Sequence, residues 1–462
     1  MVRSRLVEDN LKLLDFGEKV VKEALKLGVK DVEVYLSLKS TIHVDIERGK
    51  IVEAIKGIDQ GFCVRISYNK SLGFAYTNIL KEEKIGEVVN RAFHIAKTVK
   101  PTDDWKGFPH PKPLLKARNI YDKRVAEASI EDIVRDAFLM LNSALKTDRR
   151  VMVVEGYSGK VELVRAIVNS NGISLLEEGT GISCSLSTIA RDNGEVTPIC
   201  FEFDGSRSYN IDPEKVGKES AKMAISALGS RKIETGNYRV IFMQPALLEL
   251  LTYTLISSLK ADNVQRGKSA LKGKIGEQIA SENLTFYDDG LLEGGLETWS
   301  FDDEGTPSQK TALIEKGILR EFIYDKYHAD REGKESTGNA YRVPHPSYTS
   351  TPRIEPTNLT IQPGRYSEDE LLNELENGLL IQNLQGAHSS NPESGEFSTV
   401  ATPTWYIKNG EIQYSLKGVM ISGNIYNVLK NITCIGKNVR KLGFLVSPWI
   451  IVENVRVIGR LS

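Results

Sequence analysis

The sequence predicts an α+β protein with a duplicated helix–antiparallel-sheet–helix N-terminal domain at residues 1–235 and an antiparallel, sheet-rich C-terminal domain at residues 236–462. Three observations support this prediction. The chain has 462 residues, more than one ordinary hydrophobic core accommodates. In its first half, one order of helical and strand patterns occurs twice. In its second half, strand and hairpin signals outnumber helical ones.

The first repeat begins with a helix over residues 9–27, where leucines and valines recur at helical spacing until Gly28 ends the pattern. Alternating apolar and polar side chains then predict antiparallel strands, and a second helix closes the repeat. We place the strands at residues 31–37, 41–46, 51–55, 61–68 and 72–77, and the closing helix at 81–99.

The second repeat follows a proline-rich linker at residues 101–113. A turn around Gly159 is predicted to join two of its strands, and the G-x-G of Gly179 and Gly181 is typical of a hairpin turn. The repeat is predicted to contain helices at 131–145 and 212–228 and strands at 151–155, 160–169 and 181–190.

The C-terminal domain has three clear local signals. Asn409-Gly410 predicts a type I′ hairpin, Ser367 with Glu370 forms a capping box, and Lys316-Gly317 joins two apolar runs. The other predicted elements are strands at 240–243, 358–362, 379–384, 405–408, 411–416 and 449–457 and helices at 246–259 and 424–431.

The composition excludes several classes of function. Sixty Lys and Arg against sixty-one Asp and Glu give a net charge of -1, so no overall field attracts nucleic acid or an acidic membrane. The four cysteines are widely spaced, which favours buried free thiols over disulfides or a zinc knuckle. No apolar run reaches the roughly 20 residues of a membrane span, and no signal-peptide core is present. We therefore expect a cytoplasmic protein.

Two polar turns bracket the hairpin at residues 311–324 and are the candidate binding residues. Carboxylates, hydroxyls and backbone N–H groups at one rim suit an extended peptide or a small anion, although the simpler interpretation is two solvated turns. The candidate substrate-groove residues are Asp302, Asp303, Glu304, Gly305, Ser336, Thr337, Gly338, Asn339 and, from a later polar loop, His388. We expect this later loop, residues 386–398, to border the same groove.

Common catalytic and metal-binding motifs are absent from the sequence, including H-E-x-x-H, G-x-S-x-G and a Walker-type loop. His388 is a possible general base beside Ser389, but no carboxylate adjoins it in sequence. His328 with Glu332 is better explained as a solvated pair than as a metal site. The residues alone therefore predict no catalytic residue and no metal site on this chain.

Four C-terminal segments resemble the TldD/PmbA family, the modulators of DNA gyrase, and most closely its TldE/PmbA branch. They are GKSALKGKIGEQIAS (267–281), FDDEGTPSQKT (301–311), ESTGNAYR (335–342) and ISGNIYNVLKNITCIG (421–436). The duplicated first half also fits this family. The resemblance implies a two-domain α+β fold and a heterodimer of TldD-like and TldE-like subunits that enclose a cavity and cleave small or unfolded peptides with zinc.

In the TldD branch, an H-E-x-x-x-H helix and a later cysteine hold the zinc. The resemblance places that helix over Thr252, Tyr253 and Ser257, and the cysteine within residues 443–448, where this chain has no zinc ligand. The chain is thus expected to be a metal-free subunit beside a TldD-like zinc partner. The alternatives are an independent homodimeric hydrolase that uses His388 or His328, and a regulatory protein.

Overall fold

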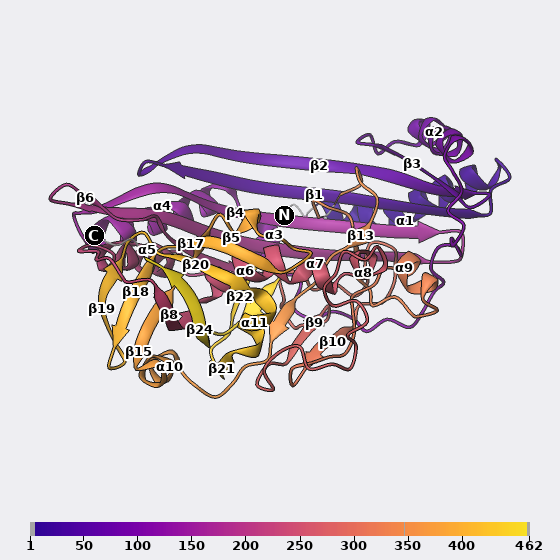
Figure 1. The fold of residues 1–462 in the computed structure, drawn as a ribbon. Helices are drawn as coiled ribbons and strands as arrows, with labels where there is room; N and C mark the ends of the chain where they lie inside the picture. The colour runs from indigo at the N-terminus through magenta and orange to yellow at the C-terminus, as the bar shows by residue number, and fades with distance from the viewer. Residues whose placement is uncertain (1–4, 346, 460–462) are drawn as a thin grey trace.

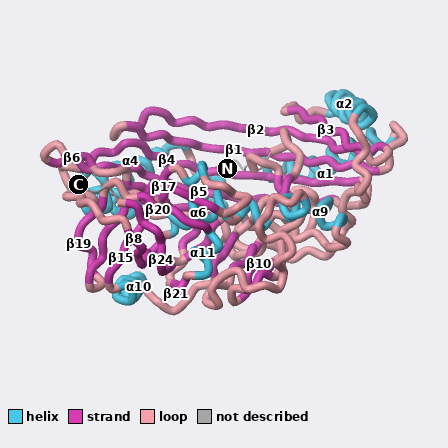
Figure 2. Tube along the Cα trace, in the orientation of Figure 1, coloured by secondary structure: helices cyan, strands magenta, loops and turns pink. Residues whose placement is uncertain are grey.

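The computed structural model describes residues 5–345 and 347–459, and a long antiparallel sheet lies across a C-terminal half that contains several smaller sheets (Figure 1). The long strands run the length of the molecule at the top of the view, and the orange and yellow strands lie beneath them. Figure 2 shows that helices collect near the two ends of the long sheet and that loops fill much of the C-terminal half.

The N-terminal sheet is built from four strands of 17 to 19 residues. Its order is β3-β2-β1-β4-β5-β6, and β7 also pairs with β5, so that β1 and β4 bring the two repeats together at the centre. The strands are β1 (Asp31–Glu47), β2 (Lys50–Tyr68), β3 (Ser71–Thr77), β4 (Val151–Asn169), β5 (Ser174–Asp192), β6 (Glu195–Val196) and β7 (Cys200–Ser206).

Four predicted breaks in these strands, one in each of β1, β2, β4 and β5, are wrong. β1 and β2 are continuous where the sequence predicted pairs of short strands, and Gly159 lies inside β4 rather than in a turn. Gly179 and Gly181 likewise lie inside β5 and not in a hairpin turn. Glycine inside a strand often marks a close approach by another segment, and a Cβ on Gly179 would lie 2.5 Å from the ring of Trp299.

Each repeat contributes helices to one face of the sheet, in the predicted order. Helix α1 packs on β1 and also on β4 of the other repeat, so Val164, Ala166 and Val168 complete the core beneath it. Helix α4 in turn packs on β1 and β2 as well as β4. The helices are α1 (Arg5–Leu25), η1 (Glu82–Lys84), α2 (Ile85–Thr98), α3 (Lys123–Glu127), α4 (Ile130–Thr147) and α5 (Pro213–Ser226).

The C-terminal half contains mixed sheets, a partial correction to the antiparallel prediction. Two of its strand pairs are parallel, β8 with β15 and β14 with β23. The strand orders are β11-β10-β9-β14-β23-β22, β12-β13, and β16-β17-β20-β24-β8-β15-β18-β19 with β21 paired to β24. The strands of the first two sheets are β9 (Phe286–Asp289), β10 (Lys310–Glu315), β11 (Ile318–Leu319), β14 (Leu359–Ile361), β22 (Arg440–Leu442), β23 (Leu445–Ser447), β12 (Ala340–Tyr341) and β13 (Arg353–Ile354).

The third sheet comprises β8 (Gly236–Phe242), β15 (Asn377–Ile381), β16 (Leu384–Gln385), β17 (Glu396–Ala401), β18 (Thr404–Lys408), β19 (Glu411–Leu416), β20 (Met420–Asn424), β21 (Ile432–Ile435) and β24 (Ile450–Ile458). The helices of this half are α6 (Gln244–Thr254), α7 (Ile256–Leu259), α8 (Ala261–Gln265), α9 (Lys326–Arg331), η2 (Ala387–Ser389), α10 (Glu368–Leu375) and α11 (Ile425–Lys430). The capping box of Ser367 and Glu370 is confirmed.

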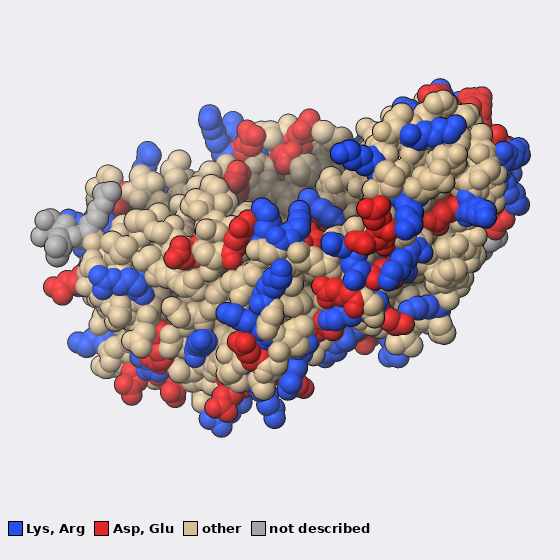
Figure 3. Space-filling model, turned by 45° about the vertical axis from the view of Figure 1, so that its right-hand side comes forward, with Lys and Arg blue, Asp and Glu red and all other residues tan. Residues whose placement is uncertain are grey.

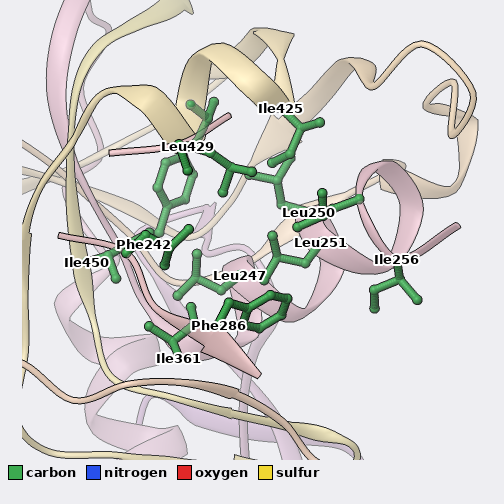
Figure 4. Close-up of a cluster of buried hydrophobic side chains, with 14 of the residues drawn as sticks. Phe242, Leu247, Leu250, Leu251, Ile256, Phe286, Ile361, Ile425, Leu429 and Ile450 are labelled. Carbon is green, nitrogen blue, oxygen red and sulfur yellow. The ribbon is translucent and has the colours of Figure 1, made fainter. Parts of the chain in front are cut away.

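Helix α6 is fixed by the C-terminal core. Its residues Leu247, Leu250 and Leu251 point into a cluster that Phe242, Phe286 and other apolar side chains complete (Figure 4). This packing sets the orientation of α6, and Thr252 of α6 and Ser257 of the following helix α7 face a pocket. The predicted free, buried state of the four cysteines is confirmed. No helix among residues 5–345 and 347–459 is long and apolar enough to cross a membrane.

Candidate functional site

The first predicted turn is buried between the two halves of the chain. The side chains of Asp302 and Asp303 are fully inaccessible, and that of Glu304 is 3% exposed. Because burying a carboxylate requires an opposite charge or several hydrogen-bond donors, these acids must have compensating partners. Arginines of the N-terminal sheet and of the second turn supply most of them.

One cluster of charges surrounds Glu33 of β1. Arg65, its partner on β2, donates two hydrogen bonds to it at 2.6 and 2.8 Å and a third to Glu304 at 2.8 Å. Arg342, which follows the second turn, donates to Glu33 at 2.6 Å. We call these four residues the Glu33 cluster. It joins β1 and β2 to both turns by bonds between buried, charged groups.

A second group of charges surrounds Arg165 of β4. Its guanidinium lies 2.8 Å from Asp303 and 3.5 Å from Glu177, and it stacks on Trp299 at 4.3 Å. The imidazole of His345 lies 3.8 Å from Asp303. Burial acts to raise the pKa of Asp303, but His345 and Arg165 outweigh it and lower this pKa to about 2.

The carboxylate of Asp302 accepts hydrogen bonds from backbone N–H groups and so stabilises the first turn. It accepts hydrogen bonds from the N–H groups of Glu304 at 3.0 Å, Thr306 at 2.9 Å and Ala340 at 3.1 Å. Burial, with the neighbouring charge of Glu304, raises the pKa of Asp302 well above its ordinary value. Gly305 has a φ of +82°, so the turn needs a residue that tolerates left-handed backbone.

The second turn also makes internal contacts. Ser336 donates to the carbonyl of Tyr324 at 3.1 Å, Thr337 donates to Asn339 at 2.6 Å, and Gly338 lies against Pro307 of the first turn. The residue at the centre of these contacts is Asn339.

Asn339 connects this turn to two other segments. Its amide donates to Asp288 at 2.7 Å and to the carbonyl of Glu355 at 3.0 Å, and the N–H of Glu355 donates to its carbonyl. Asp288 also accepts from the N–H and hydroxyl of Thr357. Burial raises the pKa of Asp288 to about 6 despite these donors.

The expected exposed rim is therefore wrong for Asp302, Asp303 and Glu304. The structure brings the two predicted turns together, whereas His388 lies on η2, exposed beside Tyr253 of α6 with ring centroids 6.3 Å apart. Whether any of the nine candidate residues contacts a substrate stays a prediction. The acids and Asn339 instead support the walls of two pockets.

The first of these, the helix pocket, has a volume of about 320 Å³. It is lined by Thr252 near the end of α6, by Ser257 of α7, by Lys260 and Phe444, and by the segments that follow the second turn. Lys260 lies 2.5 Å from Glu355, and Arg353 lies 2.6 Å from the other oxygen of the same carboxylate. The two segments that the family resemblance connects with zinc, residues 252–257 and 443–448, thus meet at one pocket.

The side chains of the helix pocket do not fit a metal ion. The hydroxyl of Thr252 donates to Leu248, that of Ser257 accepts from Asn263, and the Glu355 carboxylate is neutralised by two cations. No group of three or more His, Cys, Asp or Glu residues suited to a metal occurs within the described part of the chain. This chemistry allows the pocket to bind a polar chain, but it lacks a Lewis acid to polarise a carbonyl.

The second, the sheet pocket, has a volume of about 510 Å³ and lies on the face of the long sheet opposite its helices. Lys39, Thr41 and His43 of β1 and Gly179 of β5 contribute to its floor, and Arg207 and Trp299 contribute to its wall. Glu297 and His345 line both pockets, which therefore adjoin. Figure 3 shows a hollow on one face of the molecule, with both basic and acidic side chains around its rim.

Sequence reasoning missed most residues of both pockets, including Lys39, Arg207, Trp299 and His345. The available signal was the pair of glycines in β5, which was interpreted as a turn although each lies where a large side chain would obstruct the pocket or its wall. The remaining residues carry no local motif, because they come from segments far apart in sequence.

Comparison with known proteins gives matches along nearly the whole chain. Profiles described as PmbA/TldA metallopeptidase domain 1, central domain and C-terminal domain match residues 32–96, 123–228 and 235–459. An uncharacterized protein of Methanocaldococcus jannaschii is 33% identical over 96% of this chain and 98% of its own. Metalloprotease PmbA of Escherichia coli O157:H7 is 26% identical over 98% of this chain and 98% of its own.

The fold agrees with these sequence matches. The crystal structure of TldE from Thermococcus kodakarensis superposes with a TM-score of 0.92 at 29% identity, covering 96% of this chain and 100% of that one. The three matched segments correspond to the two repeats and the C-terminal half. The division of the chain into domains at residue 235 remains a prediction.

Proposed function

The chain belongs to the PmbA/TldD metallopeptidase family, and from this membership we propose that it is the metal-free subunit of a cytoplasmic peptidase whose zinc lies on a TldD-like partner. In this proposal, the two subunits enclose a cavity in which small or unfolded peptides are cleaved. The present chain supplies part of the cavity wall and binds the peptide main chain.

The observation that carries this proposal is the composition of the helix pocket. A family member that used its own metal would need ligands there, yet Thr252, Ser257 and Phe444 face the pocket and a Lys260–Glu355 ion pair occupies it. The likeness to TldE along the whole chain supports the same assignment.

The buried acids have a supporting role in this proposal. Asp303 contacts the segment that carries His345, and Asn339 holds the backbone of Glu355 from both sides. The two motif turns therefore position wall residues of both pockets. Ser336 and His388 remain candidates for direct contact with a peptide.

The test is zinc content and peptide cleavage, measured for the purified chain alone, for a TldD-like partner alone, and for an equimolar mixture. We expect no zinc and no cleavage from this chain alone, and cleavage by the mixture. Partner treated with a chelator and then desalted should be inactive in the mixture until zinc is restored.

Two results would contradict the proposal. Stoichiometric zinc in the chain alone would show that a metal site exists despite the ion pair. Cleavage by the chain alone, lost in His328→Ala or His388→Ala, would favour an independent homodimeric hydrolase.

A further inference from the structure

Arg207 is a buried cation on the wall of the sheet pocket, and no carboxylate of residues 5–345 or 347–459 forms an ion pair with it. Its side chain is 6% exposed, and it donates to the carbonyl oxygens of Gly295, Thr180 and Thr298 at 3.1 to 3.2 Å. It also stacks on Trp299 at 4.6 Å. A guanidinium has five N–H groups, so these bonds leave further donors available for a ligand.

Lys39 adds a second positive charge at the floor of the pocket. It forms no ion pair with any residue that the structure describes, and its cross-strand neighbour Asp59 instead accepts a hydrogen bond from Tyr348 at 2.7 Å. Because β1 residues alternate between the faces of the sheet, Lys39 projects toward the pocket side with Thr41 and His43.

Trp299 supplies an unused donor. Its side chain is 2% exposed, it lines the sheet pocket, and its indole N–H has no acceptor within the described residues. Glu297 is the one acidic residue among the pocket-lining residues, and it acts on Arg207 from beyond ion-pair distance. Lys160 also lines the pocket, but its ammonium donates to the carbonyl of Ala126 at 2.8 Å. The pocket thus combines the cations Arg207 and Lys39, an unpaired indole N–H and one carboxylate.

From these donors we propose that the sheet pocket binds a carboxylate of the peptide substrate, either its C-terminus or an Asp or Glu side chain. A carboxylate only accepts hydrogen bonds when ionised and so complements Arg207, Lys39 and Trp299. The volume of about 510 Å³ exceeds that of a single ion and admits neighbouring peptide atoms. This inference rests on the proposed function, since the adjoining helix pocket would then hold the next part of the same peptide.

The test is calorimetric titration of the full-length chain with four probes. They are an N-acetylated pentaalanine with a free C-terminus, the same peptide amidated, an amidated pentapeptide with a central glutamate, and inorganic phosphate. We expect the first or third probe to bind at least about tenfold more tightly than the amidated pentaalanine, the worth of one charge-assisted hydrogen bond. Which of the two binds identifies the source of the carboxylate.

Lys39→Gln should weaken this binding by roughly tenfold, because it removes a charge that forms no ion pair with the described residues. Lys56→Gln is the matched control, since Lys56 lies opposite Ile42 and so belongs to the other face of the same sheet. The Lys56→Gln variant should bind the carboxylate-bearing peptide as tightly as the unmodified chain does.

Equal affinity for all three peptides, no binding at all, or binding of phosphate alone would overturn the inference. So would equal effects of the two lysine substitutions. Cleavage of a neutral peptide by the two-subunit mixture is measured in parallel. If one of these outcomes is found while the mixture still cleaves the neutral peptide, only the carboxylate site is overturned. If the mixture does not cleave the neutral peptide, the proposed peptidase function is contradicted as well.

Discussion

At the scale of single residues, the contribution of Asp288 to folding stability depends on pH, and Asp288 is bonded to Asn339 of the second turn. Its carboxylate accepts three hydrogen bonds, yet complete burial raises its pKa to about 6. The folded chain therefore binds this proton more tightly than the unfolded chain does. The resulting stabilisation is complete below the ordinary pKa of 3.8 and is lost as the pH rises through about 6.

We expect Asp288 to contribute about 1.4 kcal/mol less to the free energy of unfolding at pH 7 than at pH 5, close to the value of one pKa unit. Urea unfolding of the unmodified chain and of Asp288→Asn at both pH values measures this difference. Gln413→Ala, which alters an exposed, uncharged side chain, is the control and should keep the pH dependence of the unmodified chain. Identical pH dependences for the unmodified chain and Asp288→Asn would contradict the prediction.

Gly179 is required by the approach of Trp299. A Cβ there would lie 2.5 Å from the indole ring, which two stacked guanidinium groups hold in place. We expect Gly179→Ala to lower the free energy of unfolding by about 1 to 3 kcal/mol through overpacking. Gly181→Ala, two residues along the same face, meets only Val161 at 3.1 Å and should cost less in the same urea titration.

The sequence identified some of these residues but not their surroundings. The sequence draws attention to FDDEGTPSQKT and ESTGNAYR, and their turn geometry follows from local composition. Their burial could not be predicted, because Arg65 and Arg165 that neutralise the acids lie more than a hundred residues away in sequence. An exposed acid-rich turn and a buried, ion-paired turn therefore have the same local sequence pattern, and only the distant partners distinguish them.

At the scale of elements, the long strands were predicted as fragments because residues 38–40 and 56–60 are largely polar or glycine and interrupt the apolar pattern by which a strand is recognised. The charged residues Glu33 and Arg65 of the Glu33 cluster lie within the predicted strands and did not cause these breaks. Local elements with their own signals, such as the hairpin at Lys316-Gly317 and the capping box at Ser367, were predicted correctly. Strand continuity depends on pairing across the sheet and carries no such signal.

Arg342→Gln tests how strongly this cluster joins the elements. The substitution leaves Glu33 buried with one of its two arginines, and removing one partner of a buried pair typically costs about 3 to 5 kcal/mol. Urea unfolding followed by circular dichroism measures the loss. Lys19→Gln is the control, because the Lys19–Glu82 pair is exposed to solvent and its loss should change the free energy of unfolding far less. Similar losses in the two variants would contradict the prediction.

At the scale of the whole molecule, the two repeats share one sheet and one set of helix contacts. β1 and β4 pair over 15 successive positions from Glu33 to Glu47, and α1 packs on strands of both repeats. Neither repeat therefore has a complete core of its own. This interdependence exceeds what the sequence predicted, since periodicity indicates that units are repeated but not that they are interleaved.

We expect the two repeats to unfold together. Native-state hydrogen exchange should give the same free energy of opening for the most protected amides of β1 and β4, because neither strand can separate without exposing the other. The amides of β6, a two-residue strand at the edge of the sheet, serve as a control and should exchange at much lower free energy. A β1 that opens well below β4 would show that the repeats are independent.

The shared sheet has one further consequence, for the make-up of the sheet pocket. Thr41 of β1 pairs with Val161 of β4 near the middle of both strands, and both residues line the pocket. The first repeat supplies only residues of β1 to this lining, whereas the second repeat supplies residues of β4, β5 and β7. A polypeptide made of either repeat alone would therefore lack part of the pocket, so any ligand of the pocket must contact both repeats at once.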